Sequence, residues 1–165
     1  SGGMRQRVMI GLALALRADL IIADEPTTSL DVIVEAQFLD LLRDLQRQFN
    51  LTIMLITHNI GVVAELADRV AVMYAGKLVE LAEIEPLFDE PLHPYTQGLL
   101  KSVPNINLTE DHLRIMDGSP PDLIHPPSGC RFHPRCPHVM ERCRVEMPAF
   151  REVRLARWAA CWLYE

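Results

Sequence analysis

The stretch that decides the fold is Asp19-Leu20-Ile21-Ile22-Ala23-Asp24-Glu25-Pro26. Its central apolar run predicts a short buried strand, and two adjacent acids follow at the carboxyl end of that strand. Ligand-binding side chains of parallel sheets gather at this carboxyl edge. The stretch therefore predicts an α/β fold in which Asp24 and Glu25 reach a magnesium and phosphate site. As an isolated pair, the two acids would indicate only an acidic turn before a helix.

Helical and strand patterns alternate along the first half of the chain. The predicted elements are a helix at 3–17, a strand at 20–24, a helix at 31–49, a strand at 51–57, a helix at 60–67 and a hairpin at 70–74 and 77–81. Asp31 stands where the N-cap of the second helix is expected. The strand at 51–57 would place His58 at the same sheet edge as Glu25.

Composition limits the classes of protein to which the chain can belong. The 165 residues are 49% hydrophobic and 23% charged, which is enough for one ordinary core and an appendage. Nothing approaches the roughly 20 uninterrupted apolar residues of a membrane span, and no basic-then-apolar leader opens the chain, so we expect it in the cytosol. The net charge of -6 argues against a nucleic-acid partner, which would need a clustered basic face.

From about residue 84 the sequence becomes rich in proline. Long regular elements are not expected between Pro120 and Pro148. This part is too small and loop-rich to build much core, so it needs a staple. The candidates for that staple are the chain's four cysteines, Cys130, Cys136, Cys143 and Cys161. We therefore predict two domains, at residues 1–83 and 84–165.

Several motifs of the first half, in this order, resemble the ATP-binding-cassette (ABC) ATPase family. They are the signature motif at Ser1-Gly2-Gly3-Met4-Arg5-Gln6-Arg7, Walker B at Leu20 to Asp24, the catalytic glutamate at Glu25, the D-loop at Ser29-Leu30-Asp31 and the switch histidine at His58. Their order and spacing are more specific than any single match. The phosphate-binding Gly-x-x-x-x-Gly-Lys-Ser/Thr loop is absent from the sequence, because the only Gly-Lys pair, Gly76-Lys77, continues with Leu78. The resemblance thus implies the carboxyl-terminal part of a P-loop ABC ATPase domain, a parallel sheet with helices, followed by a small loop-rich extension that contains the cysteines.

The resemblance also implies ATP and Mg²⁺ as cofactors, with Glu25 and His58 as the catalytic residues. Glu25 would polarise the attacking water, His58 would contact the γ-phosphate, and Asp24 would hold Mg²⁺. The residues implied to bind the nucleotide and its metal, or to link two active sites, are Ser1, Gly2, Gly3, Gln6, Asp24 and Asp31. The glycine pair at a helix start would bind phosphate on the opposing subunit. Without the resemblance, the Ser-Gly-Gly turn would be a helix cap and His58 a structural residue.

Segments of the second half resemble the carboxyl-terminal extension of oligopeptide and dipeptide importer ATPases. They lie at 76–80, 91–96 and 129–136. This likeness implies a peptide or, less often, nickel as cargo. The implied partners are a second ABC ATPase subunit in a homo- or heterodimer, transmembrane permease subunits and, indirectly, an extracytoplasmic solute-binding protein. The implied location is the cytoplasmic face of the cell membrane, as a peripheral subunit.

The cysteines follow the spacing Cys-x5-Cys-x6-Cys-x17-Cys. A reducing cytosol disfavours disulfides, and the Cys-x2-Cys knuckles typical of zinc ribbons are missing. The importer resemblance implies a 4Fe-4S cluster held by Cys130, Cys136, Cys143 and Cys161. Zinc and unligated structural cysteines are the alternatives, and His133 or His138 could replace a thiolate.

The predicted function is that of the ATP-hydrolysing subunit of a peptide importer. Two alternatives remain at this point: a soluble ABC ATPase of DNA repair or translation, and, for this chain, a non-catalytic metal-binding module. Because the sequence lacks the phosphate-binding loop, we expect no ATP turnover by the chain alone. We also expect its incomplete sheet to leave apolar surface exposed.

Overall fold

The computed structural model describes residues 2–28, 30–102 and 116–165, and the chain divides into two compact units, Ser1–Leu66 and Ala67–Glu165. The predicted α/β class with a parallel sheet is confirmed. The predicted domain boundary at 83/84 stays a prediction. Within the described ranges, no helix combines the length and the apolar character needed to cross a bilayer.

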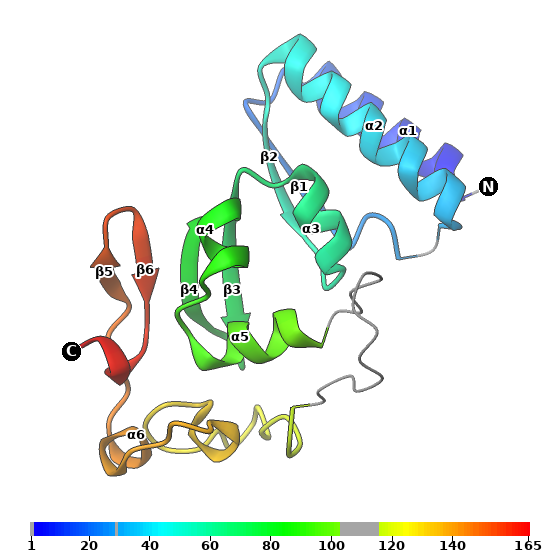
Figure 1. The fold of residues 1–165 in the computed structure, drawn as a ribbon. Coiled ribbons are helices and arrows are strands. Elements are labelled where there is room, and N and C mark those ends of the chain that lie inside the picture. Colours follow the sequence, from blue (N-terminus) through cyan, green and yellow to red (C-terminus); the bar gives the residue numbers. More distant parts are fainter. Residues whose placement is uncertain (1, 29, 103–115) are drawn as a thin grey trace, which may run out of the picture. The chain divides into compact units, whose positions relative to one another are not determined.

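The first unit pairs its strands in parallel and packs helices beside them (Figure 1). Its elements are α1 (Gly2–Ala15), β1 (Leu20–Asp24), α2 (Val32–Phe49), β2 (Thr52–Ile56) and α3 (Ile60–Leu66). The register runs from Leu20 opposite Thr52 to Asp24 opposite Ile56. The predicted elements of this part are confirmed, with bounds that differ by a few residues.

Helices cover one face of the β1–β2 pair. The buried side chains of this core are Ile10, Phe38, Leu39, Leu42 and Val62, and Ile53 and Leu55 of β2 pack against them. The opposite face is exposed, with 61% of Ile22, 52% of Met54 and 41% of Ile56 accessible. The prediction that the strand at 20–24 is buried is therefore wrong, because the helices of this unit supply only one covering layer. The expected exposure of apolar surface is confirmed.

Helix α2 begins after Asp31, the residue that the sequence predicted as its N-cap. Asp31 has an extended backbone, and its carboxylate accepts a hydrogen bond of 2.9 Å from the backbone N–H of Val34. This bond satisfies one of the backbone donors left free at a helix start. The helix ends at Asn50, which adopts the left-handed conformation common at helix ends. The predicted N-cap is confirmed.

The second unit is built on an antiparallel sheet in the order β3-β4-β6-β5 (Figure 1). Its elements are β3 (Arg69–Tyr74), β4 (Lys77–Glu83), α4 (Ile84–Asp89), α5 (Pro94–Lys101), η1 (His133–Arg135), α6 (Glu141–Val145), β5 (Arg151–Arg154), β6 (Arg157–Ala159) and η2 (Trp162–Tyr164). Ala75 and Gly76 connect β3 to β4 with positive φ angles, which a two-residue hairpin turn requires. The predicted hairpin is confirmed, and β5 and β6 add strands that the sequence patterns did not indicate.

A buried carboxylate fastens the segment before α5 to this sheet. Glu80 of β4 is fully buried, and its two carboxylate oxygens accept hydrogen bonds from the backbone N–H groups of Leu92 (2.7 Å) and His93 (2.9 Å). Arg157 of β6 lies 3.9 Å from the same carboxylate. Burial lowers the pKa of His93 to about 4, so its neutral imidazole can accept through Nδ1 from the N–H of Tyr95 at the start of α5. The Glu80 side chain thereby joins β4 to the segment that leads into α5.

Replacing Glu80 tests this role. In Glu80→Gln, one accepting oxygen becomes an amide NH₂, which cannot accept from Leu92 or His93, so we expect a loss of about 2–3 kcal/mol in the free energy of unfolding. Urea denaturation followed by tryptophan fluorescence would measure it, because Trp158 and Trp162 both lie in the second unit.

The matched control is Glu83→Gln. Glu83 is an exposed residue of the same strand whose side chain does not cap α4. We expect this control to change the free energy of unfolding by less than about 0.5 kcal/mol. Equal effects of the two substitutions would contradict the account of Glu80.

Candidate functional site

The end of the parallel strand pair brings together two residues that lie far apart in the sequence. The backbone N–H of Glu25, one residue beyond β1, donates to the carbonyl oxygen of Ile56 at 2.8 Å. Glu25 has a φ of 45°, a left-handed conformation that is unusual for a residue with a long side chain. Such backbone conformations concentrate at functional sites. The turn directs Glu25 towards His58, two residues beyond β2.

Both oxygens of the Glu25 carboxylate have hydrogen-bond partners. Nδ1 of His58 lies 2.7 Å from Oε1, and the hydroxyl of Thr28 donates to Oε2 at 2.9 Å. These hydrogen bonds, first that of His58 and then that of Thr28, lower the pKa of Glu25. Because an ionised carboxylate can only accept, Nδ1 of His58 carries the proton in this pair. The result is a charged, oriented carboxylate at the carboxyl edge of the sheet.

Asp24 completes the acidic edge. It is exposed at the end of β1, and among the described residues no donor or cation lies within bonding distance of its carboxylate. A free carboxylate beside Glu25 fits the oxygen ligands that Mg²⁺ prefers. The donor set therefore suits a magnesium ion, with Asp24 as the residue that has free coordinating oxygens.

The other predicted nucleotide residues lie at different places in the first unit. Gly2 and Gly3 begin α1, while Ser1 falls outside the described residues. The amide nitrogen of Gln6 donates to the carbonyl oxygen of Pro26, directly after Glu25. The side-chain oxygen of Gln6 is buried and has no hydrogen-bond partner among the described residues. The structure thus links α1 to the acidic turn through Gln6, and the nucleotide roles of these residues stay predictions.

Thr28 is the part of the site that sequence reasoning missed. Its position three residues after Glu25, in a Pro-Thr-Thr turn, was the available signal, because a short hydroxyl side chain in a turn can reach a neighbouring acceptor. Nothing in the sequence indicated which of the two threonines does so. In the structure Thr28 bonds to Glu25, whereas Thr27 is buried.

Removing the His58 imidazole tests the electrostatics of this pair. We expect His58→Ala to raise the pKa of the Glu25 carboxyl towards its ordinary value, because the hydrogen bond that lowers it most is lost. A pH titration of the Glu25 side-chain carboxyl signal by ¹³C NMR would measure the change.

His125→Ala is the matched control. His125 forms the same kind of pair with another acid, at 3.3 Å from Asp122. The pKa of Asp122 is lowered first by the hydrogen bond from the N–H of Ile124 and then by that of His125. We expect this variant to raise the pKa of the Asp122 carboxyl and to leave the pKa of the Glu25 carboxyl unchanged. If the pKa of the Glu25 carboxyl is the same in His58→Ala as in the parent protein, the contact between the two residues is contradicted.

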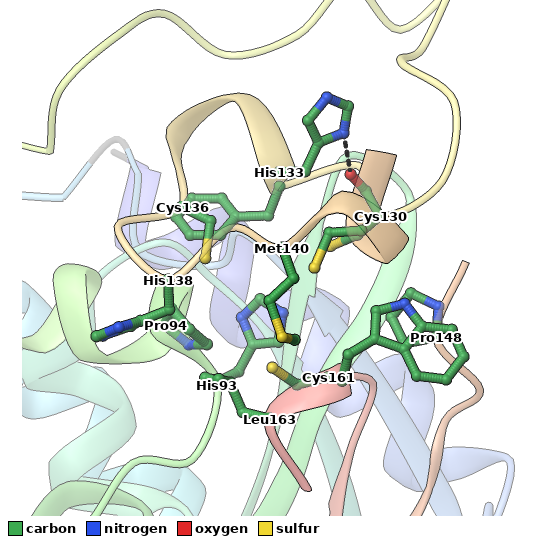
Figure 2. A pocket seen from close by; sticks show the side chains of 13 residues that line it. His93, Pro94, Cys130, His133, Cys136, His138, Met140, Pro148, Cys161 and Leu163 are labelled. Carbon is green, nitrogen blue, oxygen red and sulfur yellow. Dashed lines mark hydrogen bonds between the residues drawn. The ribbon is translucent and has the colours of Figure 1, made fainter. Parts of the chain in front are cut away.

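The four cysteines line one small cavity in the second unit, shown close up in Figure 2. All four are free thiols, and Cys143 is the most buried. The backbone N–H of Cys130 donates to the carbonyl oxygen of Cys143 at 2.8 Å, and Nδ1 of His133 lies 2.9 Å from the carbonyl oxygen of Cys130. Burial raises the pKa values of Cys130 and Cys136, and raises that of Cys161 to about 11. At neutral pH these three side chains are protonated thiols.

The prediction of a 4Fe-4S cluster in this region is wrong. In the part of the chain that the structure describes, no group of three or more His, Cys, Asp or Glu side chains is placed to hold a metal ion. The same finding removes the support for zinc. The cysteines pack together as small apolar groups around the cavity.

The raised pKa of Cys161 predicts a loss of stability in alkali. An unfolded cysteine loses its proton near pH 9, whereas folded Cys161 keeps it to about pH 11. The unfolded state therefore gains stability as pH rises between these values. We expect the free energy of unfolding of the second unit to fall across this window, and to fall less in Cys161→Ala. Urea denaturation at pH 8, 9.5 and 11 would measure how the free energy of unfolding changes with pH in the parent protein and in Cys161→Ala. Equal changes in the two proteins would contradict a raised pKa at Cys161.

A parallel sheet edge that presents Asp24, Glu25 and His58 is the arrangement expected of an ABC-type ATPase domain, and comparison with known proteins agrees. Residues 79–143 match the family described as oligopeptide/dipeptide transporter, C-terminal region. Over its whole length, the chain is similar to the carboxyl-terminal half of oligopeptide and dipeptide transport ATP-binding proteins. The predicted resemblance is confirmed.

Several curated transport ATP-binding proteins are similar to this chain at about 50% sequence identity. The oligopeptide transport ATP-binding protein AppD of Bacillus subtilis is 53% identical over the full chain, which covers 50% of AppD. The dipeptide transport ATP-binding protein DppD of the same organism is 49% identical over the full chain, and OppD of Haemophilus influenzae is 48% identical over 99% of it. The chain spans about half the length of the curated relatives it matches.

A solved structure supports the fold. A protein described as a metal-chelate type ABC transporter, in an inward-facing conformation, superposes with a TM-score of 0.52 at 30% sequence identity. The match covers 61% of this chain and 38% of the solved chain.

Proposed function

We propose that this chain, within a protein of the length of its relatives, belongs to the ATP-hydrolysing subunit that drives import of oligopeptides or dipeptides. The observation that carries the proposal is the contact between Glu25 and His58, next to the Asp24 carboxylate, which has no partner among the described residues. The names of the relatives give the substrate class. None of those names refers to DNA repair or translation, so the alternative of a soluble non-transport ATPase is not favoured.

Glu25 supplies the central chemistry of this proposal. Its lowered pKa keeps the carboxylate ionised at neutral pH, so it can accept a hydrogen bond from a water molecule and orient that water for attack on a phosphoryl group. Thr28 and His58 hold the carboxylate in one orientation. When ATP and Mg²⁺ are bound, the ion offsets charge on the phosphate oxygens, and Asp24 is the residue with free oxygens to hold it.

A second copy or a related subunit would complete the site. The residues at the start of α1, Ser1, Gly2, Gly3 and Gln6, would bind the nucleotide held by the opposing subunit, and Asp31 would link the two sites. Transmembrane permease subunits would use the resulting opening and closing, with an extracytoplasmic solute-binding protein delivering the peptide. The subunit would lie at the cytoplasmic face of the membrane. Each of these partners is proposed from the resemblance.

The amino-terminal half of the relatives, which this chain does not match, would pack against the exposed face of the first unit. The open face of β1–β2, with Ile22, Met54 and Ile56, is apolar and exposed. Further strands and helices of the amino-terminal half would cover such a face and bring the phosphate-binding loop to Asp24 and Glu25. The second unit, with its loop-rich cysteine-containing part, would be the carboxyl-terminal extension typical of the importer group, in accord with the match over 79–143.

Joining this chain to the amino-terminal half of B. subtilis AppD tests the proposal. We expect no ATP turnover above background from the 165-residue chain alone, and magnesium-dependent turnover from the joined protein. In the joined protein, Glu25→Gln should lower the turnover rate at least about 100-fold, because the amide cannot accept a proton from water.

Glu85→Gln is the control for that substitution. Glu85 is an exposed residue in the first turn of α4, and we expect turnover within about twofold of the parent. Phosphate release measured at saturating ATP would give all the rates. Robust turnover by the chain alone, or an active Glu25→Gln variant, would contradict the proposal.

A further inference from the structure

A groove opens in the second unit beside the turn between β3 and β4. It has a volume of about 450 Å³ and is lined by the end of the hairpin, by residues 130–132 and by residues from 147 to 150, together with His93 and Ala160. We call it the hairpin groove. Small-molecule sites commonly have volumes of about 300–1,000 Å³, so the hairpin groove has the size of a ligand site rather than of a packing defect.

The walls of the hairpin groove are apolar and exposed. Met73 and Leu78 of the hairpin are 58% and 41% accessible, and Met147 and Phe150 are 41% and 38% accessible. These side chains come from segments about 70 residues apart in the sequence, yet they line the same hollow. Covering them would remove apolar area from water, at roughly 25 cal/mol for each Å². The floor includes Phe132, which is fixed in the core of the unit.

The charged side chains that line the hairpin groove are positive. Lys77 and Arg131 line it, and among the described residues no Asp or Glu does. A guanidinium N–H of Arg131 donates to the carbonyl oxygen of Ala75, which holds that side chain against the turn. The ion pairs formed by the described residues involve other cations. Among the described residues, neither Lys77 nor Arg131 has a carboxylate partner, although the chain has a net charge of -6.

We propose that the hairpin groove binds a small apolar molecule that carries one carboxylate. The carboxylate lies beside Lys77 and Arg131, and its charge supplies a partner that neither cation has among the described residues. The apolar body fills the space lined by Met73, Met147 and Phe150. A carboxylate has two oxygens, so one can accept from Lys77 and the other from Arg131. This proposal does not rest on ATP hydrolysis or on peptide transport.

The probe pair for the test is 4-phenylbutanoate and 4-phenylbutanamide, which differ in the charge of one end. The full 165-residue chain, labelled with ¹³C at its methionine methyl groups, would be titrated with each probe by NMR. We expect 4-phenylbutanoate to move the signals of Met73 and Met147 with a dissociation constant on the order of 1 mM, because so small a ligand makes few contacts. The amide should bind at least about fivefold more weakly, because it cannot pair with the cations.

Lys77→Glu is the test variant, because Lys77 is exposed and its side chain bonds to no other described residue. We expect it to weaken 4-phenylbutanoate binding at least about tenfold, through loss of one attraction and gain of one repulsion. Lys77→Gln, which adds no repulsion, should weaken binding by about threefold or more. Lys101→Glu changes the chain's other lysine, which does not line the groove, and should leave the affinity within about twofold.

Four results would overturn the proposal. They are equal binding of the acid and the amide, equal affinities of the Lys77→Glu and Lys101→Glu variants, shifts confined to methionines of the first unit, and tighter binding of phenyl phosphate than of 4-phenylbutanoate. Unchanged methionine spectra of the free variants would establish that the substitutions leave the fold intact.

Discussion

The parallel pairing of β1 with β2 sets the position of every catalytic candidate in the first unit. Five residue pairs, from Leu20 opposite Thr52 to Asp24 opposite Ile56, fix the register. The hydrogen bond from the Glu25 N–H to Ile56 extends this pairing by one residue, so Glu25 and His58 leave the sheet side by side. A shift of one residue would turn Glu25 to the other face of the sheet, because side chains alternate along a strand. The charged pair is therefore a consequence of strand register.

Much of this arrangement could be predicted from the sequence, because it follows from local patterns. An apolar run that ends in two acids, and a second run that ends before His58, were enough to place Glu25 and His58 at one edge. The left-handed turn at Glu25 and the hydroxyl of Thr28 could not be predicted, since they depend on how the chain leaves β1. Exposed apolar surface was expected, but the sequence did not indicate that it would be one face of the β1–β2 pair.

The second unit was less predictable because its contacts are long-range. The bond from Glu80 to the backbone of Leu92 and His93 joins segments that no periodicity connects, and β6 reaches β4 from almost 80 residues along the chain. The importer resemblance implied a metal cluster, whereas the structure has four free cysteines around a small cavity and, among the described residues, no group placed to hold a metal ion. Cysteine spacing alone does not distinguish ligands from packing, because both uses bring the sulfur atoms together. The hairpin groove likewise depends on side chains that only the folded chain brings together.

The most direct test of the central claim is amide hydrogen exchange at Glu25 in the 165-residue chain, followed by NMR. Glu25 lies outside β1, so an isolated turn would exchange its amide proton rapidly. Because the Glu25 amide donates to Ile56, the account predicts exchange as slow as that of the amides within β1, at least about 100-fold slower than in an unfolded chain. Exchange at the unfolded rate would show that the strand pairing stops at Asp24, and that the register does not hold Glu25 against His58.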